Sequence, residues 1–277
     1  MPADRAPVYS SPAYASGATH RRNLSVETRF EVGAVIRDTF SLFFANAKIL
    51  VMAAILIQAP YVLVSAISQA SQAGSALGAF DPTSLLFFMV EMLLGLVLGS
   101  IASGAVCWAA ASSLRGERVT VVESINAALP LAPVVIGVTI ITSFLAGLGS
   151  LFFLIPGIIV ALMLWVAVPA AVVERAGVFD ALGRSRDLTE GRRLKILGAV
   201  FVFFLIIMVP ALVLIVPLAV FVGVSGEAAA AGAMGLFSAL FSVAVSSLSN
   251  TFQLYVYHEL RREKEGTGVG DVAAVFD

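Results

Sequence analysis

Long runs without a charged residue constrain this chain more than any other feature of its sequence. No Asp, Glu, Lys or Arg occurs in the 32 residues between Lys48 and Asp81, or in the 23 residues between Glu91 and Arg115. Three more uncharged runs cover residues 124–173, 196–226 and 228–258. A helix needs about 20 apolar residues to cross a bilayer. The runs therefore predict six transmembrane helices, at about Ile49–Ala70, Leu85–Leu114, Leu131–Phe153, Ile155–Val173, Ile196–Gly223 and Ala231–Tyr257.

The overall composition also indicates a membrane protein. Hydrophobic residues make up 59% of the 277 residues, whereas soluble domains are about 45–50% apolar. The single cysteine, Cys107, lies in a predicted span and excludes an internal disulfide.

The basic residues predict the topology. Of the 17 Lys and Arg, six precede the first span, two lie in the second-to-third loop, six in the fourth-to-fifth loop and three in the C-terminal tail. All of these segments lie on one side, and cytoplasmic loops are enriched in Lys and Arg. We therefore expect a multi-pass protein of the bacterial inner membrane with both termini cytoplasmic. The third-to-fourth link, Leu154 to Gly157, is expected to be a tight turn around Pro156.

Three regions are predicted. Residues 1–27 are rich in Pro, Ala and Ser and lack the apolar core of a signal peptide, so they are expected to form a disordered cytoplasmic tail. Residues 28–258 would form the six-span membrane domain, and residues 259–277 a second cytoplasmic tail.

A short segment with helical periodicity precedes each pair of spans. In the first, Thr28 and Glu31 have the spacing of a capping box, and apolar residues recur on one face up to Phe43. The second runs from Thr120 to Leu129, and the third covers residues 178–188. The expected fold is therefore an all-α membrane protein with six transmembrane helices as three hairpins, each preceded by a cytoplasmic interfacial amphipathic helix.

Polar residues inside the spans are candidate functional sites, because burying them is costly. Glu91 is the only ionisable residue well inside a span; it could serve a proton or cation relay, or be a hydrogen-bonded glutamate that faces the bundle. Asn250 and Gln253 belong to a polar stripe on the sixth span, which could line a polar path or support helix packing. Gly95 and Gly99 form a GxxxG pattern typical of helix contacts.

The segment between the fourth and fifth spans carries the densest charge. This segment could bind lipid headgroups or a protein partner at the cytoplasmic face, since an anionic leaflet attracts cations that lie next to it. The alternative is a set of solvated loop charges. The candidate contacts are Arg184, Arg186, Arg192, Arg193 and Lys195.

Motifs of catalysis are missing from the sequence. It has no GxSxG, GxxxxGK[ST] or HExxH pattern. Its two histidines, His20 and His258, lie in the predicted flexible N-terminal tail and at the cytoplasmic end of the sixth span, so neither is expected to sit with the carboxylates that a metal or acid–base site requires. We expect no enzymatic activity, no cofactor, no metal site and no nucleic-acid partner.

Two motifs resemble a known family. After Glu174, residues 178–191 read aliphatic-aromatic-x-Ala-Leu-x-Arg-Ser-x-x-Leu-Thr-x-Gly, and residues 257–266 read Tyr-x-x-Leu-Arg-x-x-x-Glu-Gly. With the Ile155-Pro156-Gly157 turn, this order is similar to the glycerophosphoryl diester phosphodiesterase membrane-domain family of bacterial multi-span proteins. Some members of that family carry a fused phosphodiesterase domain. The resemblance implies the membrane unit only, because this chain has no room for a further TIM-barrel domain of about 200 residues or more.

Two functions follow as hypotheses. The first is a non-enzymatic inner-membrane protein that binds lipid headgroups or a partner protein and serves membrane organisation or lipid homeostasis. The alternative is a transporter or permease subunit with cytoplasmic coupling helices. An intramembrane enzyme would need a catalytic pair that the sequence lacks.

Overall fold

The computed structural model describes residues 30–72, 82–152, 154–225 and 227–266, which form helices and no strand. Six helical segments among these residues are long and apolar enough to cross a membrane, as predicted. The helices, in chain order, are α1 (Val32–Gln72), α2 (Pro82–Leu114), α3 (Val121–Ala128), the 3₁₀ turn η3 (Leu129–Leu131), α4 (Ala132–Phe152), α5 (Leu154–Met163), α6 (Ala167–Val173), α7 (Val178–Thr189), α8 (Arg193–Ser225) and α9 (Glu227–Glu265).

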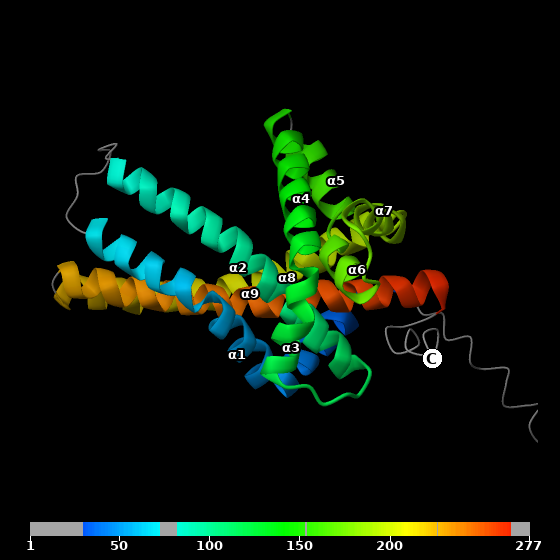
Figure 1. Cartoon of the computed structure of the whole chain (residues 1–277), viewed down its shortest axis with the longest axis horizontal. Helices are drawn as coiled ribbons and strands as arrows, with labels where there is room; N and C mark the ends of the chain where they lie inside the picture. The colour runs from blue at the N-terminus through cyan, green and yellow to red at the C-terminus, as the bar shows by residue number, and fades with distance from the viewer. Residues whose placement is uncertain (1–29, 73–81, 153, 226, 267–277) are drawn as a thin grey trace, which may run out of the picture.

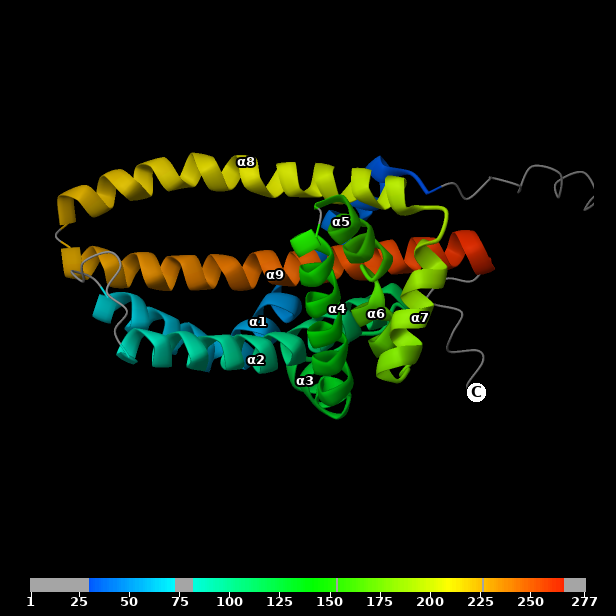
Figure 2. The ribbon, with the colours of Figure 1, turned by 90° about the horizontal axis from the view of Figure 1, so that it is seen from above.

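Two helix directions define the architecture. Helices α8 and α9 run side by side along the longest axis, with α1 and α2 beside them, whereas α4 and α5 cross that direction in both views (Figures 1 and 2). Hydropathy predicts the length of an apolar helix, but packing against neighbours sets its tilt. The crosswise course of α4 and α5 was therefore not part of the expectation.

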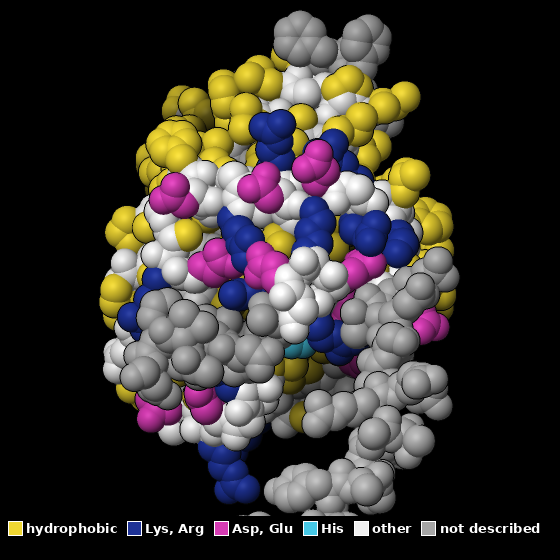
Figure 3. Space-filling model, turned by 90° about the vertical axis from the view of Figure 1, so that its right-hand side faces the viewer, with side chains coloured by type: hydrophobic (Ala, Val, Ile, Leu, Met, Phe, Trp, Pro, Cys, Tyr) yellow, Lys and Arg dark blue, Asp and Glu magenta, His cyan; other side chains and the backbone are white. Residues whose placement is uncertain are grey.

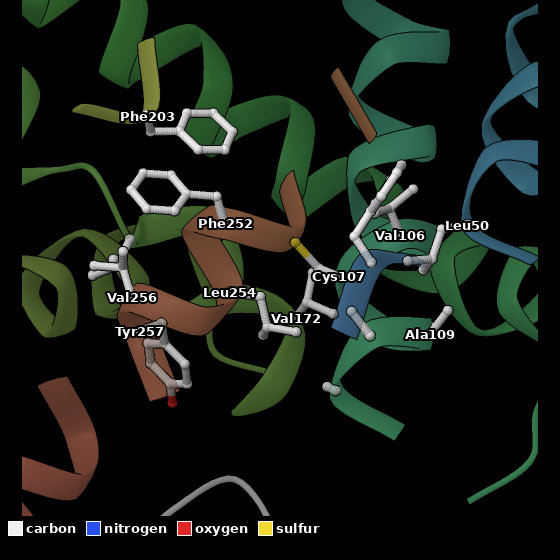
Figure 4. Close-up of a cluster of buried hydrophobic side chains, with 14 of the residues drawn as sticks. Leu50, Val106, Cys107, Ala109, Val172, Phe203, Phe252, Leu254, Val256 and Tyr257 are labelled. Carbon is white, nitrogen blue, oxygen red and sulfur yellow. The ribbon is translucent and has the colours of Figure 1, made fainter. Parts of the chain in front are cut away.

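The core lies where α9 packs against α1, α2, α6 and α8. Phe203 of α8 and Phe252 of α9 stack with ring centroids 4.2 Å apart. On the other side of α9, Leu254 is fully buried among the small residues of α2 and the end of α6 (Figure 4). The Cys107 thiol lies 3.8 Å from the carbonyl oxygen of Asn250 and donates to it.

Small residues allow α4 and α5 to pack closely. A Cβ added to Gly157 would lie 2.2 Å from Ser150 Oγ and 2.6 Å from Ser150 N, and one added to Gly149 would lie 2.9 Å from Gly157 Cα. Pro156 and Gly157 belong to the first turns of α5 rather than to the predicted tight turn.

The interfacial helices differ from the prediction in two places. The first predicted segment is not separate, because α1 continues through Asn46-Ala47-Lys48, where no Gly or Pro interrupts it. Thr28 lies outside the described residues. The predicted capping box of the second segment is present, since Thr120 and Glu123 bond each other's backbone N–H reciprocally.

The apolar side of the third segment, α7, faces the protein. Its residues Ala181, Leu182 and Leu188 are buried, and α7 packs on α4, α5, α6 and α9. Its only large exposed apolar side chain is that of Phe179, which is 78% exposed. The apolar face predicted to lie on the membrane is therefore covered by neighbouring helices.

Candidate functional site: the charged junction

Charged side chains of both signs gather at one end of the molecule. Figure 3 shows this end, where α7 and the C-terminal part of α9 lie, with Lys and Arg interspersed with Asp and Glu. Five residues, from α7, from α9 and from the position directly after α6, form its most connected cluster, which we call the charged junction: Glu174, Arg184, Tyr257, Arg261 and Glu265.

Glu174, directly after α6, is the centre of the charged junction. Its Oε1 accepts hydrogen bonds from the Tyr257 hydroxyl at 2.6 Å and from Arg184 Nε at 2.8 Å. The Nη1 atom of Arg184 also lies 2.5 Å from Oε1 of Glu265. Arg261 completes the cluster by donating to Glu265 at 3.1 Å and to the Tyr257 oxygen at 3.3 Å.

Helical spacing and burial place these side chains together. Tyr257, Arg261 and Glu265 occupy i, i+4 and i+8 positions of α9, so they share one face of that helix. Tyr257 is fully buried and belongs to the cluster of core residues (Figure 4). Its hydroxyl reaches Glu174 at the charged end. The chain then reverses from α6 into α7 through Arg175, whose φ of 50° is left-handed.

The charges of the junction balance. Two carboxylates face two guanidinium groups, and the phenol adds no charge. The hydrogen bond with Glu265 and that with Glu174 raise the pKa of Arg184 above its ordinary value, against the opposing effect of burial. This neutral, paired cluster connects α7 and α9 with the end of α6.

A second group of ion pairs ties the start of α8 to α9. Arg192 Nη2 lies 2.8 Å from Glu263 Oε1, and the Lys195 Nζ lies 3.9 Å from the same oxygen. The bond to Glu263 raises the pKa of Arg192. Lys264 donates to the backbone carbonyl of Asp187 on α7.

The five predicted headgroup contacts therefore divide into two sets. Arg184, Arg192 and Lys195 are engaged in ion pairs within the protein. Arg186 is exposed and forms no ion pair with a described residue. Arg193 is partly buried, and its Nε has no hydrogen-bond partner among the described residues.

The helix of the fourth apolar segment is interrupted, and side chains of α7 bond to the backbone groups at the interruption. Residues 164–166 separate α5 from α6, just before Pro169, which has no N–H to donate. The Val166 N–H donates to Ser185 Oγ at 3.3 Å, and the Ser185 hydroxyl donates to the Met163 carbonyl at 2.9 Å. Thr189 Oγ1 lies 3.2 Å from the same carbonyl. Side chains of α7 thus replace the missing helical hydrogen bonds.

The predicted intramembrane polar residues do not form one site. One carboxylate oxygen of Glu91 is buried without a hydrogen-bond partner among the described residues. Asn250 contacts α2 at Cys107, which is 16 residues from Glu91 and therefore about 24 Å further along the helix. The Asn250 and Gln253 side chains are partly buried. The described residues contain no group of three or more His, Cys, Asp or Glu that could hold a metal ion.

Sequence reasoning missed the carboxylate partners of the arginines. Glu263 and Glu265 were treated as part of a tail, although α9 continues as one helix to Glu265. The spacing Tyr257-x-x-x-Arg261-x-x-x-Glu265 is a readable signal, because it places three hydrogen-bonding groups on one helix face.

Comparisons with known proteins give a distant match. Proteins of Yersinia pestis (strain Pestoides F) and Yersinia pseudotuberculosis serotype O:3 (strain YPIII), both called "UPF0259 membrane protein", are 31% identical to this chain over 74 residues. The match spans 27% of this chain and 29% of the length of each relative. No family model and no solved structure matches.

These findings correct the family assignment made from the sequence motifs. Membership of the glycerophosphoryl diester phosphodiesterase membrane-domain family is wrong, since the relatives carry the UPF0259 name and no family model matches. The motif residues Arg184 and Tyr257 both bond to Glu174, so these positions of the motifs meet where α7, α9 and the end of α6 pack. The relatives and the six apolar helices support a multi-pass membrane protein.

Proposed function

We propose that this chain is a non-enzymatic integral protein of the bacterial inner membrane that binds anionic lipid headgroups at its charged end and serves membrane organisation or lipid homeostasis. The topology predicted from the basic residues places this end and both termini in the cytoplasm. A fluorescent protein that folds only in the cytoplasm, fused to the C-terminus, tests that placement: a dark fusion contradicts it.

One observation carries the lipid proposal. Two large apolar side chains are exposed at the charged end, Phe179 at 78% and Leu194 at 83%. Each lies on an element that also presents an arginine without an ion pair among the described residues, Arg186 on α7 and Arg193 at the start of α8. Apolar groups beside cations suit the interface of a bilayer, where rings and aliphatic chains insert and cations meet phosphates.

The test separates free arginines from paired ones. Replacing both Arg186 and Arg193 with Gln removes two cations that are each worth about 1 kcal/mol near an anionic surface, or about 30-fold in affinity together. Native mass spectrometry of the purified protein in mixed phosphatidylglycerol micelles measures the bound lipid. The control is Arg37→Gln, whose side chain is exposed and paired with Asp38. Equal lipid retention in both variants contradicts the proposal.

A second function, a transporter or permease subunit, is favoured by the break between α5 and α6. Discontinuous membrane helices are a recurring feature of transporters. The short helix α7 lies at the charged end and bonds to the backbone at this break through Ser185. It would act as the coupling helix to a motor protein. Purification of the intact chain under mild detergent tests this function: an ATPase recovered in a fixed molar ratio supports it, and a chain recovered without one contradicts it.

A further inference from the structure

A partly open cavity of about 160 Å³ lies between α1, α2, α4 and α9, all of which contribute to candidate membrane spans. It is separate from the charged junction. Polar side chains line it from all four helices: Gln58 from α1, Ser100 and Ser103 from α2, Thr139 from α4 and Ser246 from α9. Gly95, Leu96 and Gly99 of α2 complete the lining.

Part of this polar lining has no partner in the protein. The Thr139 hydroxyl donates to the Val135 carbonyl at 2.8 Å, and the Ser246 hydroxyl donates to the Val243 carbonyl at 2.9 Å. By contrast, no hydrogen bond joins the Gln58 amide or the Ser103 hydroxyl to another residue in the described part of the chain. Uncompensated polar groups are costly in an apolar region, so the cavity favours an occupant that bonds to them.

The small residues along α2 do not all serve close helix packing. A Cβ on Gly95 would lie 3.6 Å from the Tyr61 ring, and one on Gly104 would lie 3.5 Å from Ala128. These are ordinary contacts between helices. A Cβ on Gly99 would meet no atom within 4 Å. The second glycine of the GxxxG pattern thus borders open space, and it keeps the cavity wide.

The lining restricts the chemistry of an occupant. No charged side chain is among its residues, and burying an ion without a counter-charge is strongly unfavourable. Glu91 is one helical turn before Gly95 and does not line the cavity. The volume is below the roughly 300–1,000 Å³ of pockets for drug-sized ligands. We propose that this cavity binds a small uncharged molecule that carries hydroxyl or amide groups, a role independent of headgroup binding at the charged end.

The chain's single cysteine makes a direct test possible. In a Cys107→Ala background, Ser103→Cys places a thiol on the cavity wall, and iodoacetamide serves as a small uncharged reagent. The protein is held in lipid nanodiscs, and its alkylation rate is measured by mass spectrometry with glycerol, urea or sodium acetate present. Ser238→Cys, exposed on α9, is the control for reaction from the lipid side. Gly99→Leu fills the cavity without removing a polar group, and Gly198→Leu, also with open space around it, is its control.

The expected result is alkylation of Ser103→Cys that glycerol or urea slows and sodium acetate does not. At about ten times its Kd, a competing ligand lowers the free fraction about tenfold, and the rate falls with it. Gly99→Leu would abolish the protection, and Gly198→Leu would retain it. Three outcomes overturn the proposal: no alkylation of Ser103→Cys, a rate that neither uncharged probe changes, or equal protection of Ser238→Cys. If Gly99→Leu does not fold, Gly99→Ala, which fits without a clash, replaces it.

Discussion

Removing one hydroxyl from the charged junction tests whether this cluster stabilises the helix packing. In Tyr257→Phe the ring remains in its fully buried position, and the only group lost is the hydroxyl that donates to Glu174 at 2.6 Å. A hydrogen bond to a charged group contributes about 1.5–3 kcal/mol. Glu174 keeps its two bonds from Arg184, so we expect a loss of about 2 kcal/mol in the free energy of unfolding.

The assay is thermal unfolding of the purified chain in detergent. For a domain of this size 1 kcal/mol corresponds to about 2–4 °C in Tm, so Tyr257→Phe should lower Tm by about 4–8 °C. Tyr255→Phe is a matched control on the same helix, since its hydroxyl donates at 3.1 Å to Asp38, which is already paired with the exposed Arg37. Its effect should be below about 1 kcal/mol.

A double-mutant cycle then isolates the contact itself. The variants Tyr257→Phe and Glu174→Gln, alone and combined, should show a coupling energy of about 1 kcal/mol or more, because the two groups touch. The reasoning is refuted if Tyr257→Phe costs no more than Tyr255→Phe, or if the effects of the two substitutions simply add.

Two further predictions concern the α4–α5–α7 region. Gly157→Ala should destabilise the protein by about 1–3 kcal/mol, because its Cβ would lie 2.6 Å from the backbone nitrogen of Ser150; Gly147→Ala, which meets no atom within 4 Å, should not, and equal Tm values would contradict the close-packing argument. Ser185→Ala should leave the Val166 N–H unsatisfied at a cost of about 1–3 kcal/mol, seen as faster hydrogen exchange of that amide, whereas unchanged exchange would show that the break needs no hydroxyl.

The spans could be predicted because they depend on one local property. A run without charges, such as residues 196–226, requires burial in lipid or protein whatever the rest of the chain does. The break in the fourth span was also readable, since Pro169 lies inside that run and cannot donate to residue 165. Its repair by Ser185 was not, because it depends on a contact between two helices.

The direction of α4 and α5, and the partners of the arginines, could not be predicted from local pattern. Charge counting treats Arg184 and Arg186 alike, yet only Arg184 faces Glu174 and Glu265. Which cations are paired depends on the packing of α7 against α9, and the paired residues Arg184 and Glu265 are 81 residues apart in the chain. The cavity was beyond prediction for the same reason, since its lining comes from four helices.

The break between α5 and α6 has a consequence for biogenesis. An N–H or carbonyl without a partner is costly in the hydrocarbon region, so this segment gains a stable place in the bilayer only after the Ser185 and Thr189 hydroxyls reach Met163 and Val166. Because α7 begins within five residues of the end of α6, the hydroxyls leave the ribosome directly after the segment that needs them. The insertion machinery therefore receives the interrupted segment and α7 almost together. A translational pause placed between them would expose a helix with unpaired backbone groups to quality-control proteases.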